Sequence, residues 1–388
     1  MDGNLVFGST VDLAGTTQLR IYGNNGNTVT FNGILSSSGN GGANQVSINQ
    51  NSNVVYAAAN SYTGDTFVNA GKLQFALGGS ANGSAIRLGD TSGSINAEVS
   101  IINAAGGTTV ASLINVRSGS AGTKTISGTN TAGTNTFYGD VFLDAGVTVI
   151  STNAGGTLAF TGATFDVKSQ TLSLGGAGNI SISSPISSST SGGALSMSGT
   201  GTLTLGNTNA YTGLTTINSG TLKITNAGAL GTAAAGTTVV GGATLDISTA
   251  GTVAGEALTL NGTGVGGNGA LVVNNSGTWS GAVSIATAST INVAPGVTWT
   301  DSHATGTVVT GALTKTGNGT LLLTTGITTG IGTLAVNAGT FAVNGTARWN
   351  SGNITVNSSG TLQTTGGTDS VGDTLTITVN SGGAWDFQ

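Results

Sequence analysis

The stretch Asn209–Ile224 reads NAYTGLTTINSGTLKI, and the chain returns to this pattern repeatedly. Within and beside it, Leu214–Asn218 and Thr221–Thr225 combine Thr with apolar residues, a composition that fits the pleated surface of a strand. Ser219-Gly220 separates the two runs, and Gly tolerates the positive φ that a sharp corner requires. The stretch therefore predicts two short strands joined at a tight Asn/Gly corner.

Further copies of the pattern extend along the chain. NSYTGDTFVNAGKLQF at Asn60–Phe75 repeats the whole unit. The second half recurs alone at Val239–Ile247, Val336–Val343, Val356–Thr364 and Val379–Phe387. Self-similarity at short intervals indicates an architecture in which no single unit buries its own apolar face. The positions that we expect to hold the repeat together are Tyr62, Gly64, Asn69, Gly71 and Leu73 in one copy and Tyr211, Gly213, Asn218, Gly220 and Leu222 in the other.

The predicted fold is all-β, a right-handed parallel β-helix in which like residues stack turn over turn. At roughly 20–25 residues per turn the chain would make about 15–19 turns, and strand spacing of about 4.8 Å would give a rod on the order of 75–90 Å long. No composition shift marks a linker, so we expect one continuous solenoid over residues 1–388, with less regular turns at 1–53 and repeat-bearing turns at 54–388. The alternatives are an antiparallel sandwich or a propeller.

Composition excludes several classes of protein. The chain has 68 Gly, 2 Pro, 9 Lys and Arg together and 14 Asp and Glu together, which fits neither collagen nor highly charged disorder. A net charge of −5 with scattered cations makes nucleic acid a poor partner. Ala97–Val116, the most apolar stretch, is broken by Gly and Thr and is not a spanning helix. Cys is absent, which suits a secreted chain that crosses a membrane unfolded.

Ser198–Ile224, SGTGTLTLGNTNAYTGLTTINSGTLKI, closely resembles the autotransporter-associated β-strand repeat of bacterial autotransporter passengers and giant Gly/Thr/Asn-rich surface proteins. Asn60–Phe75 resembles the second half of that motif, and Lys315–Leu323 the first half. The resemblance implies a secreted β-solenoid and says little about activity. Met1–Asn4 lacks the basic start of a signal peptide, and no translocator barrel is apparent, so we expect a fragment, a processed passenger or a protein exported differently.

Motifs for catalysis or ligand binding are weak. A single His and no Cys leave too few ligands for the usual metal sites, and no calcium nonapeptide or EF-hand loop occurs. Asp301-Ser302-His303 lacks a nucleophile elbow, so His303 is expected to be a polar loop residue. Gly262–Gly267 fits Gly-x-Gly-x-x-Gly but leads into a predicted strand, Ala270–Val273, rather than a helix that would cradle phosphate.

One pair of carboxylates needs a structural check, because β-helices host polysaccharide lyases and hydrolases. Asp140 and Asp144 on one strand would lie about 13 Å apart. Asp144 and Asp166, 22 positions apart in the chain, would lie about 5 Å apart if they stacked on adjacent turns, within the retaining-glycosidase range. Lys168 is the only basic neighbour, and we expect solvated or corner-capping carboxylates rather than catalysis.

The sequence thus predicts a non-enzymatic structural protein of the bacterial cell surface or extracellular space, a β-helical stalk or fibre segment. It predicts no catalytic residue, cofactor, metal, nucleic-acid partner or membrane insertion. Two alternatives stay open. One is a protomer that assembles end to end into an extracellular filament, because uncapped solenoid turns dock readily on a neighbour. The other is an adhesin that binds a surface glycan or another host or cell-surface ligand through its Thr, Ser and Asn rows.

Overall fold

The computed structural model describes residues 3–14, 18–23, 26–38, 44–81, 85–303, 307–326, 328–365 and 370–388. Contacts divide the chain into two units, each described by itself below. The first comprises residues 1–195 and 199–203, and the second comprises 196–198 and 204–388. Strand β25 (Ala194–Leu205) supplies residues to both. The prediction of one continuous solenoid over the whole chain stays a prediction.

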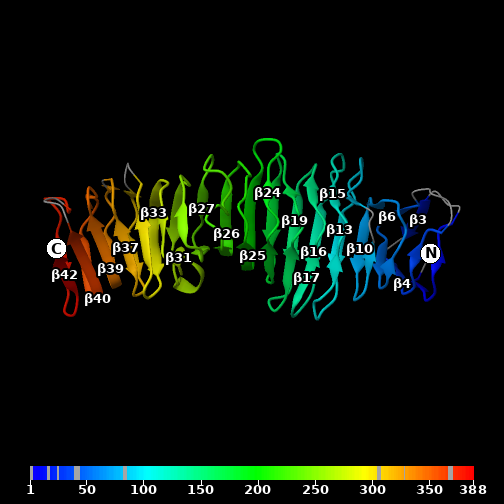
Figure 1. Cartoon of the computed structure of the whole chain (residues 1–388), viewed down its shortest axis with the longest axis horizontal. Helices are drawn as coiled ribbons and strands as arrows, with labels where there is room; N and C mark the ends of the chain where they lie inside the picture. Colours follow the sequence, from blue (N-terminus) through cyan, green and yellow to red (C-terminus); the bar gives the residue numbers. More distant parts are fainter. Residues whose placement is uncertain are drawn as a thin grey trace. The chain divides into compact units, whose positions relative to one another are not determined.

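The first unit is built from columns of parallel strands that stack in chain order (Figure 1). The longest column contains β1 (Leu5–Phe7), β4 (Thr28–Phe31), β7 (Asn53–Tyr56), β10 (Gly71–Phe75), β13 (Ala97–Ile101), β16 (Lys124–Gly128), β19 (Val147–Ser151) and β22 (Thr171–Gly175). A second contains β14 (Thr109–Val110), β17 (Thr134–Phe137), β20 (Thr157–Phe160) and β23 (Asn179–Ile182). The third contains β3 (Gln18–Gly23), β6 (Gln45–Gln50), β9 (Thr66–Val68), β12 (Ile86–Leu88), β15 (Ile114–Val116), β18 (Val141–Leu143), β21 (Phe165–Asp166) and β24 (Ile186–Ser187).

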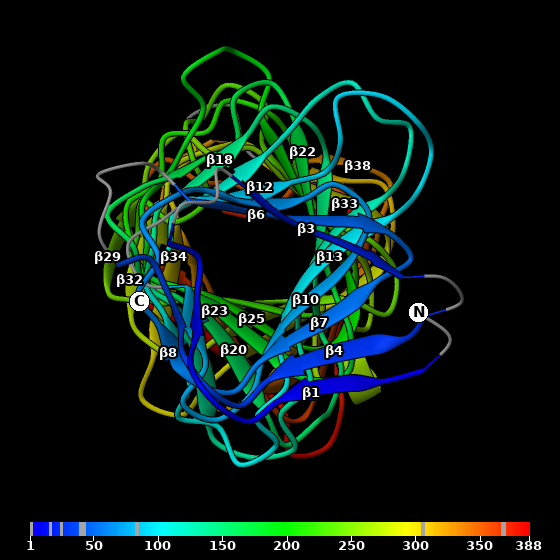
Figure 2. The ribbon, with the colours of Figure 1, turned by 90° about the vertical axis from the view of Figure 1, so that its right-hand side faces the viewer.

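These columns form the walls around the apolar core of the first unit. In Figure 2, β3, β6 and β12 cross the top, β4, β7 and β10 lie at lower right, and β20 and β23 lie at lower left. Two short pairs, β2 (Val11–Asp12) with β5 (Leu35–Ser36) and β8 (Ala59–Asn60) with β11 (Ser80–Ala81), complete the early turns. Alternate side chains point inward and stack, as in the column Leu5, Val29, Val54, Leu73, Val99, Ile126, Val149 and Leu174.

The second unit repeats this plan with longer strands that bend at corners. One column contains β27 (Thr237–Val239), β30 (Leu258–Gly262), β35 (Val308–Val309) and β38 (Thr329–Gly330). A second contains β28 (Thr244–Ile247), β31 (Leu271–Val273), β36 (Leu313–Thr316) and β41 (Ile377–Val379). A third contains β29 (Gly251–Val253), β32 (Gly277–Trp279), β34 (Thr298–Asp301), β37 (Thr320–Leu323) and β42 (Ala384–Phe387). The strands that join two columns are β26 (Thr215–Ile224), β33 (Val283–Val293), β39 (Leu334–Asn344) and β40 (Ile354–Thr365).

The parallel β-solenoid is therefore confirmed. Every pairing whose register the structure gives is parallel, and the strands make about 16 turns. Partners on neighbouring turns lie 19 to 28 residues apart in the first unit, as between Val54 and Leu73 or Ile86 and Ile114. The antiparallel sandwich and the propeller are excluded, because both require antiparallel neighbours.

The predicted corner is present, but the strand does not break there. The sequence predicts two strands, whereas the structure has one, β26, with φ of 73° at Gly220. Residues on either side of the corner pair with β27 and β28 of the same neighbouring turn, so the ladder continues around the bend. The described residues include one short 3₁₀ turn, Val265–Gly267, and no helix among them has the length and apolarity to cross a membrane.

Candidate functional site

The repeat tyrosines are core residues with a fixed hydrogen-bond partner. Tyr62 and Tyr211 are almost fully buried. The Tyr62 hydroxyl lies 2.5 Å from Oγ1 of Thr66, and the Tyr211 hydroxyl lies 2.6 Å from Oγ1 of Thr215, in each case four residues along the chain. A buried hydroxyl needs such a partner. The sequence analysis singled out the tyrosines but missed this role, although a Thr four residues later in both copies is the signal for it.

The Asn two residues before each tyrosine joins neighbouring turns. Nδ2 of Asn60 donates to the carbonyl of Ser80 at 2.9 Å, and Nδ2 of Asn209 donates to the carbonyl of Ala229 at 2.6 Å. Both acceptors lie 20 residues along the chain. The two copies of the repeat thus build the same clamp, in which the Asn side chain donates to a main-chain carbonyl of the next turn.

The remaining motif residues form the corner. Leu73 and Leu222 are fully buried, while φ is 86° at Gly71 and 73° at Gly220. A methyl carbon added at Gly64 would lie 2.4 Å from the carbonyl oxygen of Asn44, and Gly213 lies just before β26. Nδ2 of Asn69 donates to Asn49 and Ser47, and Nδ2 of Asn218 donates to Ser196 and Ser198. These motif residues pack and cap the turns.

The two carboxylates considered for glycoside chemistry do not stack on each other. Asp166 pairs with Phe142 of the preceding turn, so the turn is 24 residues long at this point, and Asp144 lies beside Lys168 instead. Lys168 and Asn115 donate to Asp144, and the bond from Lys168 lowers the pKa of its carboxyl.

Asp166 caps a loop of the next turn. Burial opposes its ionisation, but hydrogen bonds from Ser189 and from the Lys168 amide outweigh burial and lower its pKa. Asp140 accepts a hydrogen bond from the Thr164 amide at 2.8 Å. The expectation of corner-capping carboxylates therefore describes both Asp140 and Asp166.

The Asp301-Ser302-His303 segment is not arranged as a triad. Asp301 lies in the core column below Trp279, where burial raises its pKa. Its carboxylate accepts hydrogen bonds from the Thr307 hydroxyl at 2.5 Å and from the backbone amide of His303 at 3.2 Å. The Ser302 hydroxyl donates to the carbonyl of Trp279 at 3.4 Å. The segment caps a turn.

The glycine-rich segment also lacks a phosphate cradle. The predicted strand after it is present as β31, but Val265–Gly267 forms a 3₁₀ turn that the sequence did not indicate. The amide of Val265 donates to Oγ1 of Thr244 at 2.9 Å. In the described part of the chain, no group of three or more His, Cys, Asp and Glu side chains is placed to hold a metal ion.

Two buried ionisable groups in the second unit were missed by the sequence analysis. Lys315 occupies a core column between Ile291 and Val336, and its Nζ donates to the carbonyls of Thr316, Gly317 and Ala338 at 2.7–3.0 Å. Burial lowers its pKa to about 8.

Glu256 accepts a hydrogen bond from the Thr237 hydroxyl at 2.7 Å and is nearly fully buried. Burial raises its pKa to about 7. Thr237 pairs in register with Thr215, the partner of Tyr211, so this carboxyl extends the buried polar cluster of the repeat. Lys315 and Glu256 are both buried in the core of the second unit.

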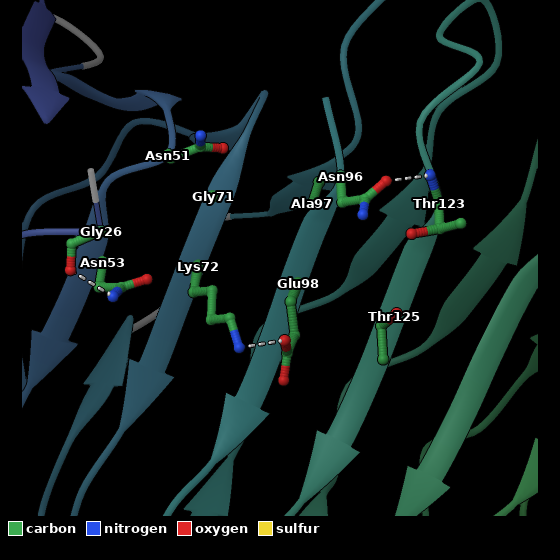
Figure 3. A pocket seen from close by; sticks show the side chains of 10 residues that line it. All are labelled: Gly26, Asn51, Asn53, Gly71, Lys72, Asn96, Ala97, Glu98, Thr123 and Thr125. Carbon is green, nitrogen blue, oxygen red and sulfur yellow. Dashed lines mark hydrogen bonds and ion pairs between the residues drawn. The ribbon is translucent and has the colours of Figure 1, made fainter. Parts of the chain in front are cut away.

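A polar groove of about 430 Å³ lies on the outer face of the first unit, over β7, β10, β13 and β16 (Figure 3). Asn53, Lys72, Glu98 and Thr125 form one outward row, because each pairs in register with the next. Asn51, Asn96 and Thr123 lie at the strand entrances above this row. The groove could not be recognised from the sequence, because the residues that line it are separated by intervals of unequal length.

The groove side chains are held in place by bonds at their edges. Nζ of Lys72 lies 2.9 Å from Oε2 of Glu98, whose Oε1 accepts a hydrogen bond from the Ser127 hydroxyl at 2.7 Å. Nδ2 of Asn53 donates to the Gly26 carbonyl at 2.8 Å, and Oδ1 of Asn96 accepts from the Thr123 amide at 2.9 Å. Figure 3 shows the Asn96 amide nitrogen turned away from that bond.

The first unit also contains an apolar cavity of about 270 Å³ among its earliest turns. Its walls include Leu5, Phe7, Ile21, Val29 and Phe31. The rings of Phe7 and Phe31 stack with centroids 5.0 Å apart. This cavity is lined mainly by apolar side chains, whereas mainly polar residues line the groove.

A comparison with protein families identifies the repeat. The family model described as passenger-associated-transport-repeat matches residues 57–75 and 195–224. These segments contain the two copies of the Asn–Tyr–Thr clamp described above, so the resemblance to autotransporter passenger repeats is confirmed. No curated protein and no solved structure matches the chain.

Proposed function

We propose that this chain, which carries two passenger-associated-transport repeats, is a non-enzymatic structural segment of a secreted or surface-exposed bacterial protein. Its role is that of a right-handed β-helical stalk that projects or links. The proposal rests on one observation about the motif. In both copies of the repeat, the Asn, Tyr, Thr, Gly and Leu residues pack the core and hold neighbouring turns together. A stalk needs such continuous internal columns and no reactive centre.

The charge distribution supports the same role. The carboxylates considered for chemistry accept hydrogen bonds from neighbouring turns, and two of the cationic side chains, Lys124 and Lys315, are themselves buried. A surface with few ionised groups and many Thr, Ser and Asn residues needs little counter-charge from its surroundings. It suits a protein that works outside the cell at variable ionic strength.

End-to-end assembly into a filament is the second candidate. The apolar cavity among the first turns favours it, because a solenoid turn of a second copy would cover that surface. Handedness and surface location belong to the proposal as well. A high-resolution experimental structure tests the first, and protease shaving of intact cells that express the full-length parent protein tests the second.

Negative-stain electron microscopy of the purified chain across a concentration series separates these candidates. A stalk gives discrete rods of about 80 Å at every concentration, since about 16 turns rise by about 4.8 Å each. Filaments that lengthen with concentration would replace the stalk by the assembling protomer. Compact particles would refute both.

A further inference from the structure

We propose that the polar groove over β7, β10, β13 and β16 binds a neutral saccharide. The groove lies on one outer face of the first unit, away from the core columns, and its lining comes from successive turns (Figure 3). The inference adds a ligand to the surface segment proposed above. It relies on that proposal only for the setting in which a saccharide would be encountered.

The charge of the groove selects against ions. Among the described residues that line it, the ionised side chains are Lys72 and Glu98, and they neutralise each other at 2.9 Å. An anion would have to displace Glu98 from Lys72, and a cation would have to displace Lys72 from Glu98. Each displacement leaves one charge of the pair without its partner, so a neutral polar ligand meets the smallest opposition.

The remaining hydrogen-bonding capacity matches sugar hydroxyls. Nδ2 of Asn53 donates to the Gly26 carbonyl, so Oδ1 of Asn53 is left as a hydrogen-bond acceptor. The Thr123 amide donates to Oδ1 of Asn96, so Nδ2 of Asn96 is left as a hydrogen-bond donor. Lys72 retains further N–H donors, and the Thr125 hydroxyl both donates and accepts. A sugar hydroxyl also does both, so it satisfies this mixed set better than a ligand of one polarity.

The dimensions of the groove agree with an oligosaccharide. Asn53, Lys72, Glu98 and Thr125 occupy four neighbouring strands, so the row extends across about 14 Å. The volume of about 430 Å³ lies in the range of small-molecule sites. Among the described residues that line it, none is aromatic, and Ala97 is the largest apolar residue. A protein partner is disfavoured, because protein interfaces depend on buried aromatic and Arg anchors.

The test uses the whole chain and saturation-transfer NMR with three neutral probes, cellotriose, maltotriose and N,N′,N″-triacetylchitotriose, followed by titration of any that binds. The decisive variant is Asn96→Asp, which keeps the acceptor for the Thr123 amide and removes the Nδ2 donor. Lys72→Met removes the second donor. Thr148→Val is the matched control, since Thr148 follows Thr125 in the same row but does not line the groove.

At least one trisaccharide should bind the wild-type chain, and Asn96→Asp and Lys72→Met should each weaken it about tenfold or more. The control should bind as the wild type does, and all variants should keep the wild-type unfolding temperature. Three results would overturn the inference: no binding of any probe, equal binding by the groove variants, or displacement of the saccharide by inorganic phosphate, which would mark an anion site. Rod-like particles in the microscope would leave the stalk intact in each case.

Discussion

At the residue scale, the polar groups that the repeat motif brings into the core of this solenoid are paired with one another. The repeat tyrosine is the clearest case, because its hydroxyl and the Thr four residues later satisfy each other away from water. Burial raises the pKa of Tyr211, so this hydroxyl stays protonated at physiological pH. The motif is therefore a packing unit with an internal hydrogen bond.

Tyr211→Phe should lower the free energy of unfolding by about 1–3 kcal/mol, because Oγ1 of Thr215 then stays buried without its partner. Tyr138→Phe is the control, since Tyr138 is 60% exposed. Denaturant unfolding followed by circular dichroism measures both. Equal stability of the two variants would show that the hydroxyl plays no part in the clamp.

The Glu256 carboxyl should make stability depend on pH in the acidic to neutral range. Its folded-state pKa of about 7 exceeds the ordinary Glu pKa of 4.5, so between these two pH values the folded chain binds a proton that the unfolded chain has released. The free energy of unfolding is then highest at a pH below the pKa of the unfolded state, and it falls as the pH rises through the pKa of the folded state. Glu256→Gln should remove this part of the decline in unfolding temperature. A variant that follows the wild-type pH curve would contradict the assignment.

Lys315 should act with the opposite sign at alkaline pH. Its folded-state pKa of about 8 lies below the ordinary Lys pKa of 10.5, so between these two pH values the unfolded chain holds a proton that the folded chain lacks. Stability should therefore rise with pH over that window. Lys315→Met should lack this rise in thermal unfolding measured at several pH values. Matching slopes in wild type and variant would mean that the ammonium is not buried as described.

At the scale of the strand and its corner, glycine determines where a turn bends. At Gly71, φ is 86°, and an added methyl carbon would lie 2.2 Å from the carbonyl oxygen of Ser52 on the preceding turn. Both the left-handed backbone and the close approach exclude a side chain. The corner therefore fixes the direction of the chain and the contact with the neighbouring turn together.

Gly71→Ala should cost at least about 1–3 kcal/mol from backbone strain alone, with the clash against Ser52 adding to it. Gly146→Ala is the matched control, because nothing lies within 4 Å of an added methyl carbon there and its φ is not in the left-handed region. Thermal unfolding of both variants measures the difference. A tolerated Gly71→Ala together with a damaging Gly146→Ala would contradict the corner geometry.

The strands and corners of the repeat could be predicted from sequence, because Thr and apolar residues alternate around an Asn/Gly pair. The register between neighbouring turns could not be predicted from the sequence. Asp166 lies opposite Phe142, not Asp144, since the length of each turn varies with its loops. The groove was missed for the same reason: the steps from Asn53 to Lys72 and from Lys72 to Glu98 differ in length.

The buried Lys315 shows a second limit of the sequence pattern. KTGNGTLLL, Lys315–Leu323, resembles the first half of the repeat, and that resemblance does not say which way the Lys315 side chain points. The structure places this side chain in line with Leu222, Leu245, Leu271 and Ile291. Three backbone carbonyls at the corner accept hydrogen bonds from Nζ of Lys315 and so stabilise its inward position. The pattern of residue types does not show where such carbonyls lie.

At the scale of the whole molecule, each of the two units depends on one property, the stacking of its turns on one another in parallel register. Columns, clamps, corners and the groove all follow from that stacking. The passenger-associated-transport repeat occurs in two segments of the chain, residues 57–75 and 195–224. Later strands that carry partial copies of the pattern pair in the same parallel way.

Disulfide trapping tests this stacking most directly, because the chain contains no Cys of its own. Thr216 pairs with Thr238, and Thr238 pairs with Thr259. Partners about 4.8 Å apart accept a disulfide, whereas residues two turns apart, at about 9.6 Å, do not. Mass spectrometry of oxidised Thr216→Cys/Thr238→Cys should find the cross-link, and Thr216→Cys/Thr259→Cys should stay reduced. Cross-linking of the second pair without the first would contradict the solenoid described here.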